Sequence, residues 1–263
     1  MSYMTRSHGP ASVPERPAPR PSLLFRIGKK MRHRIGAVIA RSSRVGDTPV
    51  YDSKLFPWMA QLEARWPEIR AEVDALLARE DGIPPLAAIS PDHRRIASPG
   101  KWKSFFLWGY GYRNEGNIAR CPKTAAAVEP IPGLNSAFFS ILAPGAHIPR
   151  HRGVTKAILT AHLGLIVPRR RQDCRMQVED RMLRWDEGRM LVFDDTHFHE
   201  VWNDTDEQRV ILLIQFRRPA DFLGRLVGGL FLAAVRHSRF VQDARSSLGA
   251  WEKAMQRLER NRG

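Results

Sequence analysis

Three histidines and one arginine in the second half of the chain are the residues whose types and spacing could support catalysis. His151, His162 and His199 are separated by stretches long enough to form strands, and Arg209 lies ten residues after the last of them. Imidazole nitrogens suit ferrous iron, and a site with two histidines leaves coordination positions for an oxo-acid and for dioxygen. A guanidinium gives a planar fork for the distal carboxylate of such an acid. The spacing alone also fits histidines with a structural role.

Short strands are expected to position these residues. Strand-like runs at 137–142, 158–167, 189–193 and 210–216 are separated by Gly, Pro and Asp turns. Strands and helices do not alternate here, so the sequence predicts an antiparallel sandwich or barrel. Apolar residues at helical spacing predict a helix over 56–79 that packs on this β domain.

Both ends of the chain are basic, whereas its middle is almost neutral. The net charge is +15, and residues 1–50 carry ten Lys or Arg against two acids, while 217–263 carry ten against four. This distribution indicates an anionic partner, either nucleic acid or a membrane surface, or else two solvated tails. Because the middle is neutral and contains no recognised nucleic-acid module, we expect no nucleic-acid partner.

Two segments near the ends have the composition of membrane-surface elements. Residues 23–45 place apolar residues at helical spacing among basic ones, as in amphipathic helices that lie in a lipid interface. The apolar run 226–235 is too short for a bilayer, which needs about 20 residues. It either packs on the core or enters a membrane surface, flanked by Arg225, Arg236 and Arg239.

Length and cysteine content limit the class of protein to which the chain can belong. A chain of 263 residues buries a core without disulfides, and Cys121 and Cys174 are too few for a disulfide framework. No apolar signal peptide is visible, so we expect a cytoplasmic protein. The predicted segments are a disordered tail (1–22), the basic amphipathic segment (23–45), a helical lead-in (50–98), the β domain (99–219) and a basic helical segment (220–263).

The sequence motifs that contain the histidines are more specific than the spacing between them. The strings His151-Arg-Gly153, Ala161-His162-Leu-Gly-Leu-Ile-Val-Pro168, Trp185-Asp-Glu-Gly188, Phe193-Asp-Asp-Thr196 and His199-Glu-Val-Trp-Asn203 occur in this order, followed by Arg209. Over residues 99–219 this pattern resembles the aspartyl/asparaginyl β-hydroxylase family of Fe(II)- and 2-oxoglutarate-dependent oxygenases. The resemblance implies a mainly β fold with a double-stranded β-helix core (jelly roll, cupin-like), flanked by N- and C-terminal helices.

The same resemblance implies the cofactors and their ligands. His151 and His199 are expected to bind iron, while Ser140, His162 and Arg209 are expected to hold 2-oxoglutarate, with Arg209 on its distal carboxylate. The implied reaction uses dioxygen, decarboxylates 2-oxoglutarate to succinate and adds one oxygen to a C–H bond of the substrate.

Several neighbouring residues are assigned other roles. Gly153 stands where most 2-oxoglutarate oxygenases carry a carboxylate ligand, and the family likewise lacks that carboxylate. His147 and His197 fall off the family pattern and are expected near the ligands or at the surface. Asp194 and Asp195 are expected to shape the turn and to orient the following histidine ligand through hydrogen bonds.

Two residues expected in the substrate pocket differ from those of the family members that hydroxylate aspartyl residues. Members that hydroxylate aspartyl residues carry arginines two and four positions before the His of the HLGL motif, where this chain has Thr160 and Ile158. Without those guanidinium groups a substrate carboxylate would be buried unpaired. Trp102 is expected to line the same pocket.

A smaller branch that the chain resembles hydroxylates fatty acyl chains of lipid A and ornithine lipids next to the carbonyl. The apolar Ile158 and the basic ends favour this branch, with ornithine lipid slightly ahead of lipid A. We expect a lipid substrate at an anionic membrane surface, with the protein bound peripherally to the inner membrane. The alternatives are β-hydroxylation of aspartyl or asparaginyl residues or of a free or carrier-bound amino acid, and a non-enzymatic nucleic-acid-binding protein. The oligomeric state is left open.

Overall fold

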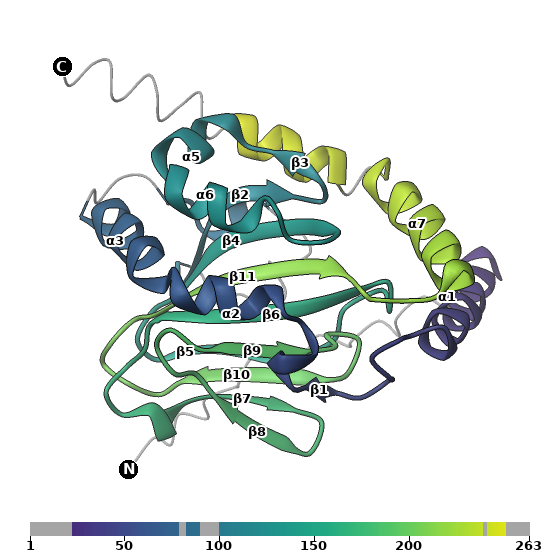
Figure 1. Ribbon diagram of the computed structural model, residues 1–263, viewed down its shortest axis with the longest axis horizontal. Coiled ribbons are helices and arrows are strands. Elements are labelled where there is room, and N and C mark those ends of the chain that lie inside the picture. Colours follow the sequence, from purple (N-terminus) through teal and green to yellow (C-terminus); the bar gives the residue numbers. More distant parts are fainter. Residues whose placement is uncertain (1–22, 79–82, 90–99, 239–240, 251–263) are drawn as a thin grey trace, which may run out of the picture.

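Two antiparallel sheets pack against each other in the computed structural model, which describes residues 23–78, 83–89, 100–238 and 241–250 (Figure 1). The larger sheet has the order β1 (Val50–Tyr51), β9 (Met190–Phe193), β6 (Ile158–Ile166), β11 (Arg209–Arg217), β4 (Leu134–Leu142), β2 (Trp102–Gly109) and β3 (Tyr112–Arg113). The smaller sheet has the order β5 (Ala146–His151), β10 (His199–Asn203), β7 (Cys174–Val178) and β8 (Arg181–Arg184).

The path of the chain through these sheets is that of a jelly roll. Strands β4, β6, β9 and β11 lie in the larger sheet, and β5, β7, β8 and β10, which alternate with them along the chain, lie in the smaller one. The predicted double-stranded β-helix is therefore confirmed. The four predicted runs correspond to β4, β6, β9 and β11, whereas the strands of the smaller sheet were not predicted.

Helices cover the outer face of the larger sheet. The helical elements between the two ends are η1 (Ser53–Leu55), α2 (Trp58–Ala64), α3 (Trp66–Leu77), α4 (Leu86–Ile89), α5 (Glu115–Arg120), α6 (Pro122–Val128) and η3 (Arg171–Asp173). The single helix predicted over 56–79 is wrong, because α2 ends before Arg65 and α3 restarts with Pro67 in its first turn. Proline lacks the N–H that a continuing helix requires but is well tolerated at a helix start. Leu62, Ile69 and Val73 still pack on the sheet, as the pattern predicted.

The two end helices lie side by side at one end of the sandwich (Figure 1). They are α1 (Leu23–Arg41) and α7 (Phe222–Arg236), and residues 241–250 form a further helical stretch. Glycines allow the close approach of α7, since a Cβ on Gly224 would lie 2.5 Å from the Cβ of Ser42.

The apolar run in α7 is not a core helix. Leu226 is 49% and Leu230 is 66% exposed, and Phe222 is 73% exposed at the start of the helix. Among the described residues, no helix combines the length and apolarity needed to cross a bilayer. The predicted tail (1–22) and Arg239 lie outside the described residues, and the predicted segment boundaries stay predictions.

Candidate active site

Two histidines from neighbouring strands form a close pair in the smaller sheet. His151 ends β5 and His199 begins β10; their Cα positions are paired in the register, and their ring centroids are 4.1 Å apart. The Nδ1 of His151 lies 2.9 Å from the carbonyl oxygen of Pro149, and the Nδ1 of His199 lies 3.0 Å from that of His197. Since a carbonyl only accepts, each Nδ1 carries the hydrogen and each Nε2 keeps its lone pair.

Burial keeps both imidazoles neutral. It lowers the pKa of His199 to about 4, with the nearby His151 acting in the same direction, and it also lowers the pKa of His151. A neutral imidazole that donates Nδ1–H to a carbonyl is the form in which histidine binds a metal through Nε2. The pair therefore fits a divalent metal ion such as ferrous iron.

The space for a third protein ligand, two residues after His151, is filled by a different carboxyl group. A Cβ on Gly153 would lie 2.2 Å from Oδ1 of Asp195. Thr160 Oγ1 and Gln215 Nε2 lie 3.3 and 3.4 Å from Oδ2 of Asp195, whereas its Oδ1 is buried and has no partner among the described residues. Burial and then the charge of the preceding aspartate raise the pKa of Asp195 to about 7. A carboxyl that is partly protonated at neutral pH thus lies beside Gly153.

Arg209 is a buried cation without a counter-ion. It is 2% exposed, its guanidinium lies 4.7 Å from the ring centroid of Trp185, and its Nε has no hydrogen-bond partner among the residues that the structure describes. No carboxylate of the described residues pairs with it, and burial lowers its pKa to about 10. Because an unpaired buried charge is costly, this arrangement indicates a site for an anion.

His162 supplies a second unused donor close to Arg209. Trp185 donates its Nε1–H to Nδ1 of His162 over 3.3 Å, so the hydrogen of the neutral ring is on Nε2. That Nε2 is buried without a partner in the described part of the chain. Burial, followed by the charges of Arg209 and His199, holds the pKa of His162 well below its usual value. Arg209 and His162 therefore provide one cationic and one neutral hydrogen-bond donor without an acceptor among the described residues. A carboxylate of 2-oxoglutarate fits as that acceptor.

The remaining predicted residues complete the wall. Trp102 Nε1 donates to Ser140 Oγ over 2.9 Å, and Ser104, opposite Ser140 in the register, has a buried hydroxyl without a partner in the described residues. One cavity of about 840 Å³ is lined by all eight residues predicted for iron, 2-oxoglutarate and substrate, namely Trp102, Ser140, His151, Ile158, Thr160, His162, His199 and Arg209.

The cavity extends away from the histidines along mostly apolar walls. Phe106, Phe138 and Leu213 line it within the sandwich, and Phe231 and Val235 line it where it reaches α7. Its mostly apolar lining suits a hydrocarbon chain better than a charged side chain.

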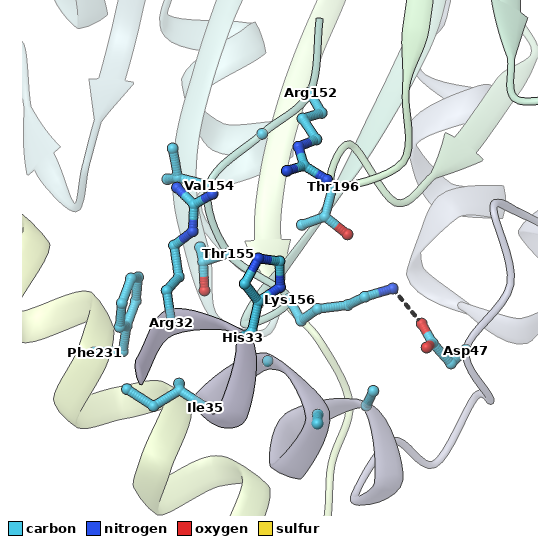
Figure 2. Close-up of a pocket in the computed structure, with 14 residues that line it drawn as sticks. Arg32, His33, Ile35, Asp47, Arg152, Val154, Thr155, Lys156, Thr196 and Phe231 are labelled. Carbon is cyan, nitrogen blue, oxygen red and sulfur yellow. Dashed lines mark hydrogen bonds and ion pairs between the residues drawn. The ribbon is translucent and has the colours of Figure 1, made fainter. Parts of the chain in front are cut away.

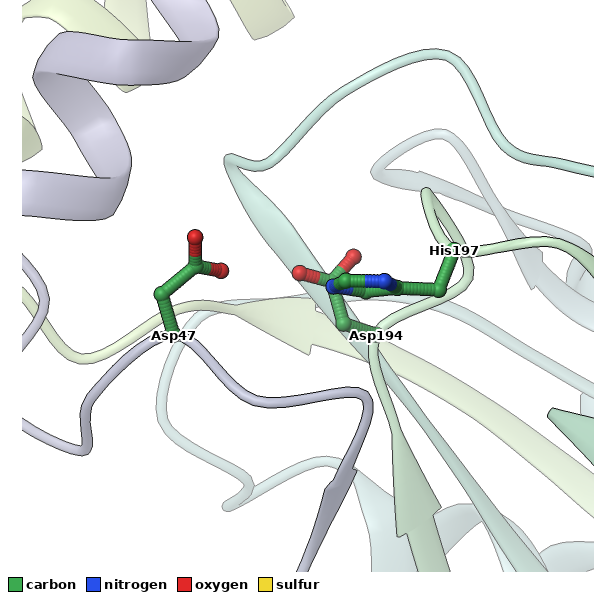
Figure 3. Close-up of side chains that lie close together, drawn as sticks. All are labelled: Asp47, Asp194 and His197. Atoms are coloured by element: carbon green, nitrogen blue, oxygen red, sulfur yellow. The ribbon is translucent and has the colours of Figure 1, made fainter. Parts of the chain in front are cut away.

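A second group of potential metal ligands lies outside this cavity. Asp47, Asp194 and His197 approach one another closely enough to share an ion (Figure 3). However, Lys156 Nζ lies 2.5 Å from Asp47 and 2.9 Å from Asp194, and Arg218 also pairs with Asp194. Two fixed cations thus already neutralise the carboxylates, so this cluster is an ion-pair network rather than a metal site.

The structure corrects one expected role of the aspartates. Asp194 does shape the turn, accepting hydrogen bonds from the backbone and hydroxyl of Thr196 at 2.9 and 2.6 Å. Neither Asp194 nor Asp195 has a hydrogen bond to His199, whose ring is oriented by the His197 carbonyl instead. The sequence could not indicate this hydrogen bond, because every residue has a backbone carbonyl whatever its type.

Two other residues near the site had no predicted role. Trp185 contacts both Arg209 and His162, and its position inside a quoted motif was the available signal. Gln215, which contacts Asp195, left no signal in the sequence. His147 lies at the surface, 2.7 Å from Glu200, as its departure from the pattern suggested.

Comparison with known proteins finds relatives that are named as hydroxylases. The chain is 38% identical over 237 residues to an ornithine lipid ester-linked acyl 2-hydroxylase of Rhizobium tropici, covering 90% of this chain and 84% of that one. It is 32% identical over 163 residues to the human aspartyl/asparaginyl beta-hydroxylase, covering 60% of this chain and 21% of that one. A prolyl-4-hydroxylase structure from Pseudomonas putida is 20% identical with a TM-score of 0.38, covering 59% of this chain and 88% of that one.

A family match agrees with these relatives. The sequence profile described as Aspartyl/Asparaginyl beta-hydroxylase matches residues 63–219. The match begins at the end of α2 and includes α3, α5 and α6 of the helical layer, so the shared region is longer than the stretch that the motifs indicated. The chain therefore belongs to the aspartyl/asparaginyl beta-hydroxylase family.

Proposed function

We propose that this protein is an Fe(II)- and 2-oxoglutarate-dependent dioxygenase that hydroxylates a fatty acyl chain of a bacterial membrane lipid at C2. Ornithine lipid is favoured over lipid A. The observation that carries the cofactor requirement is Arg209, a buried cation that no carboxylate of the described residues neutralises. It lines the cavity that also contains the neutral pair His151 and His199.

Each residue of the site has a separate task. His151 and His199 hold the metal through Nε2, while Arg209 and His162 bind a carboxylate of 2-oxoglutarate, with Ser140 at the adjoining wall. When bound, iron and 2-oxoglutarate supply the oxidation, in which dioxygen provides the new hydroxyl oxygen and 2-oxoglutarate becomes succinate. The chain itself positions these groups and excludes water from the apolar cavity.

The walls and the relatives support an acyl substrate. Ile158 and Thr160 line the cavity where a carboxylate-binding member would carry arginines, so no guanidinium at these positions pairs with a substrate carboxylate. The relative that shares 38% identity over 90% of this chain is named for 2-hydroxylation of an ester-linked acyl chain of ornithine lipid.

A second candidate is β-hydroxylation of aspartyl or asparaginyl residues, or of a free or carrier-bound amino acid. The 32% identity to the human aspartyl/asparaginyl beta-hydroxylase favours it. The mostly apolar walls and the neutral pair Ile158 and Thr160 argue for the lipid instead.

We infer an anionic membrane surface as the partner of the exposed end helices. Leu223, Leu226 and Leu230 form an exposed apolar stripe on α7, and Arg225 and Arg236 are exposed on the same helix. Apolar side chains in the interface and arginines at its rim are the arrangement of peripheral membrane elements. Each arginine near an anionic surface adds about 1 kcal/mol to binding.

Mass spectrometry of total lipids from a bacterium that makes ornithine lipid tests the function. We expect a gain of one oxygen on an ester-linked acyl chain with the intact protein and none with His199→Ala. His147→Ala, which removes a surface histidine, is the matched control and should retain activity. Unchanged lipids with a folded, iron-loaded protein would remove the lipid assignment, and full activity of His199→Ala would remove the iron ligand.

A further inference from the structure

A second, smaller pocket adjoins the catalytic cavity between α1 and the loop after β5 (Figure 2). Its volume is about 230 Å³. Arg32 from α1 and Arg152 from the loop line both this pocket and the larger cavity, as does the loop backbone at Gly153. The two spaces therefore share lining residues and lie next to each other.

The pocket contains guanidinium groups that lack a carboxylate partner. In the described part of the chain, neither Arg32 nor Arg152 takes part in an ion pair, and Arg152 lies over the ring of Phe198 at 5.0 Å. Lys156, the other cation of the pocket, is already paired with Asp47. Figure 2 shows Arg32 extending from α1 and Arg152 extending from the loop after β5, whereas Lys156 points away toward Asp47. Two guanidinium groups therefore remain for an external anion.

The chain order links this pocket to the chemistry. Arg152 directly follows His151 and both residues line the larger cavity, so an anion held by Arg152 lies at the wall of the space that the histidine pair also lines. A lipid has its charged headgroup at one end and its acyl chains beyond it. If the headgroup occupies the basic pocket, its acyl chain enters the apolar cavity close to the headgroup end, where C2 of that chain is located.

We infer that this pocket binds the carboxylate of the lipid headgroup, through Arg32 and Arg152. The inference rests on the proposed function and deepens it, because it makes the headgroup, rather than the acyl chain alone, decide which lipid is used. The planar fork of arginine matches the two oxygens of a carboxylate. A phosphate has related chemistry, so the test distinguishes these two headgroups.

Direct binding to the full chain, loaded with Mn²⁺ and 2-oxoglutarate, tests the site. The probes are water-soluble short-chain N-acylornithine, its carboxyl methyl ester and a short-chain phosphatidylglycerol, measured by calorimetry. Arg32→Ala and Arg152→Ala should each weaken binding of N-acylornithine roughly tenfold or more. Arg34→Ala, an exposed arginine of the same helix outside the pocket, is the matched control and should bind like the natural protein.

The methyl ester should bind weakly to the natural protein and be insensitive to both substitutions. Equal loss of affinity for the ester, or no loss for N-acylornithine, would overturn the site. Equal affinity for phosphatidylglycerol would overturn its assignment to a carboxylate. If N-acylornithine binds as expected but no lipid is hydroxylated, the proposed function fails while the pocket stands. If lipid is hydroxylated with an unchanged KM in both variants, the pocket fails while the function stands.

Discussion

Arg209 illustrates how one buried side chain constrains the identity of a ligand. Its burial without a counter-ion among the described residues disfavours the ligand-free protein, because effective desolvation costs several kcal/mol per ion. Trp185 covers the guanidinium but neutralises nothing. A bound dicarboxylate would supply the missing charge, so stability and cofactor binding are coupled at this residue.

Replacing Arg209 with methionine should therefore separate stability from cofactor binding. We expect Arg209→Met to melt higher than the natural protein without ligand, since the uncompensated charge is gone. With Mn²⁺ present, 2-oxoglutarate at 100 times its Kd should stabilise the natural protein by about 2.7 kcal/mol and the variant not at all. Thermal melts with and without 2-oxoglutarate measure both effects. A variant that 2-oxoglutarate stabilises as much as the natural protein would exclude Arg209 from the site.

Asp195 should make the metal-free protein less stable as pH rises. Its pKa in the folded protein is about 7, above the ordinary 3.8, so the native state keeps a proton that the unfolded chain has lost. The stability this proton provides is complete below pH 4 and is lost as pH rises toward and through 7. Asp195→Asn should thus melt higher than the natural protein at pH 8 and equally at pH 4.

Asp194 is the matched control with the opposite sign. Burial alone would raise its pKa, but Arg218, Thr196 and Lys156 lower it overall. Stability from this carboxylate is present above pH 4, so Asp194→Asn should melt lower than the natural protein at pH 8. Equal shifts of both variants at pH 8 would contradict the assigned protonation states.

The strands differ in how strongly the sequence indicates them, and the two faces of each sheet explain why. Strands β4, β6, β9 and β11 lie between the helical layer and the smaller sheet, so most of their residues are buried and give long apolar runs. Strands β7 and β10 alternate buried and partly exposed residues over five positions. Such short alternation is weak, and for this reason the smaller sheet was missed.

The site was more predictable than the smaller sheet, which carries the two expected iron ligands His151 and His199. Four of the eight predicted residues came from motifs in a fixed order and the other four from the family resemblance, and the structure brings all eight to one cavity. What the sequence could not reveal were contacts made by folding, such as Trp185 against Arg209, or the pocket shared by α1 and the loop at Arg152. Those contacts join residues distant in the chain, and no local pattern records them.

Gly164 fixes the turn that carries Trp185 against strand β6. A Cβ at this position would lie 2.2 Å from the backbone carbonyl oxygen of Asp186, so the turn would have to move. We expect Gly164→Ala to destabilise the protein by about 1–3 kcal/mol, the usual cost of overpacking. Because Trp185 supports Arg209 and His162, the KM for 2-oxoglutarate should rise as well. Urea unfolding and succinate formation measure the two effects; unchanged stability would contradict the packing argument.

The exposed stripe of α7 should determine membrane binding through its apolar residues. Leu226→Glu combined with Leu230→Glu places charges where we propose contact with acyl chains, and should weaken binding to vesicles at least tenfold. Met182→Glu, at a residue 44% exposed on β8, adds one charge elsewhere and should leave binding unchanged. Sedimentation with phosphatidylglycerol vesicles measures this. Equal binding by the double variant and the Met182 control would remove α7 from the interface.

Folding brings together features that are far apart in the chain. The two basic ends are separated by a nearly neutral β domain, yet α1 and α7 lie side by side at one end of the sandwich (Figure 1). The catalytic cavity reaches Phe231 and Val235 of α7 and Arg32 of α1. The same end of the molecule therefore carries basic residues, exposed apolar residues and part of the cavity lining, which is the arrangement that the proposed lipid substrate requires.

The two contributions to the proposed membrane binding differ in their response to salt. The net charge of +15 is concentrated at the ends, and attraction between exposed charges and anionic lipid is screened beyond a Debye length of about 10 Å at 0.1 M salt and about 3 Å at 1 M. Apolar contact by the α7 stripe does not depend on charge. The affinity of the natural protein for phosphatidylglycerol vesicles should therefore fall steeply as salt rises. It should level off at a residual affinity equal to the affinity of the same protein for phosphatidylcholine vesicles. The Leu226→Glu and Leu230→Glu double variant should lose that residual binding in 1 M salt. Salt-independent binding of the natural protein would show that the basic ends do not contact the membrane, whereas complete loss at high salt would show that the apolar stripe does not enter it.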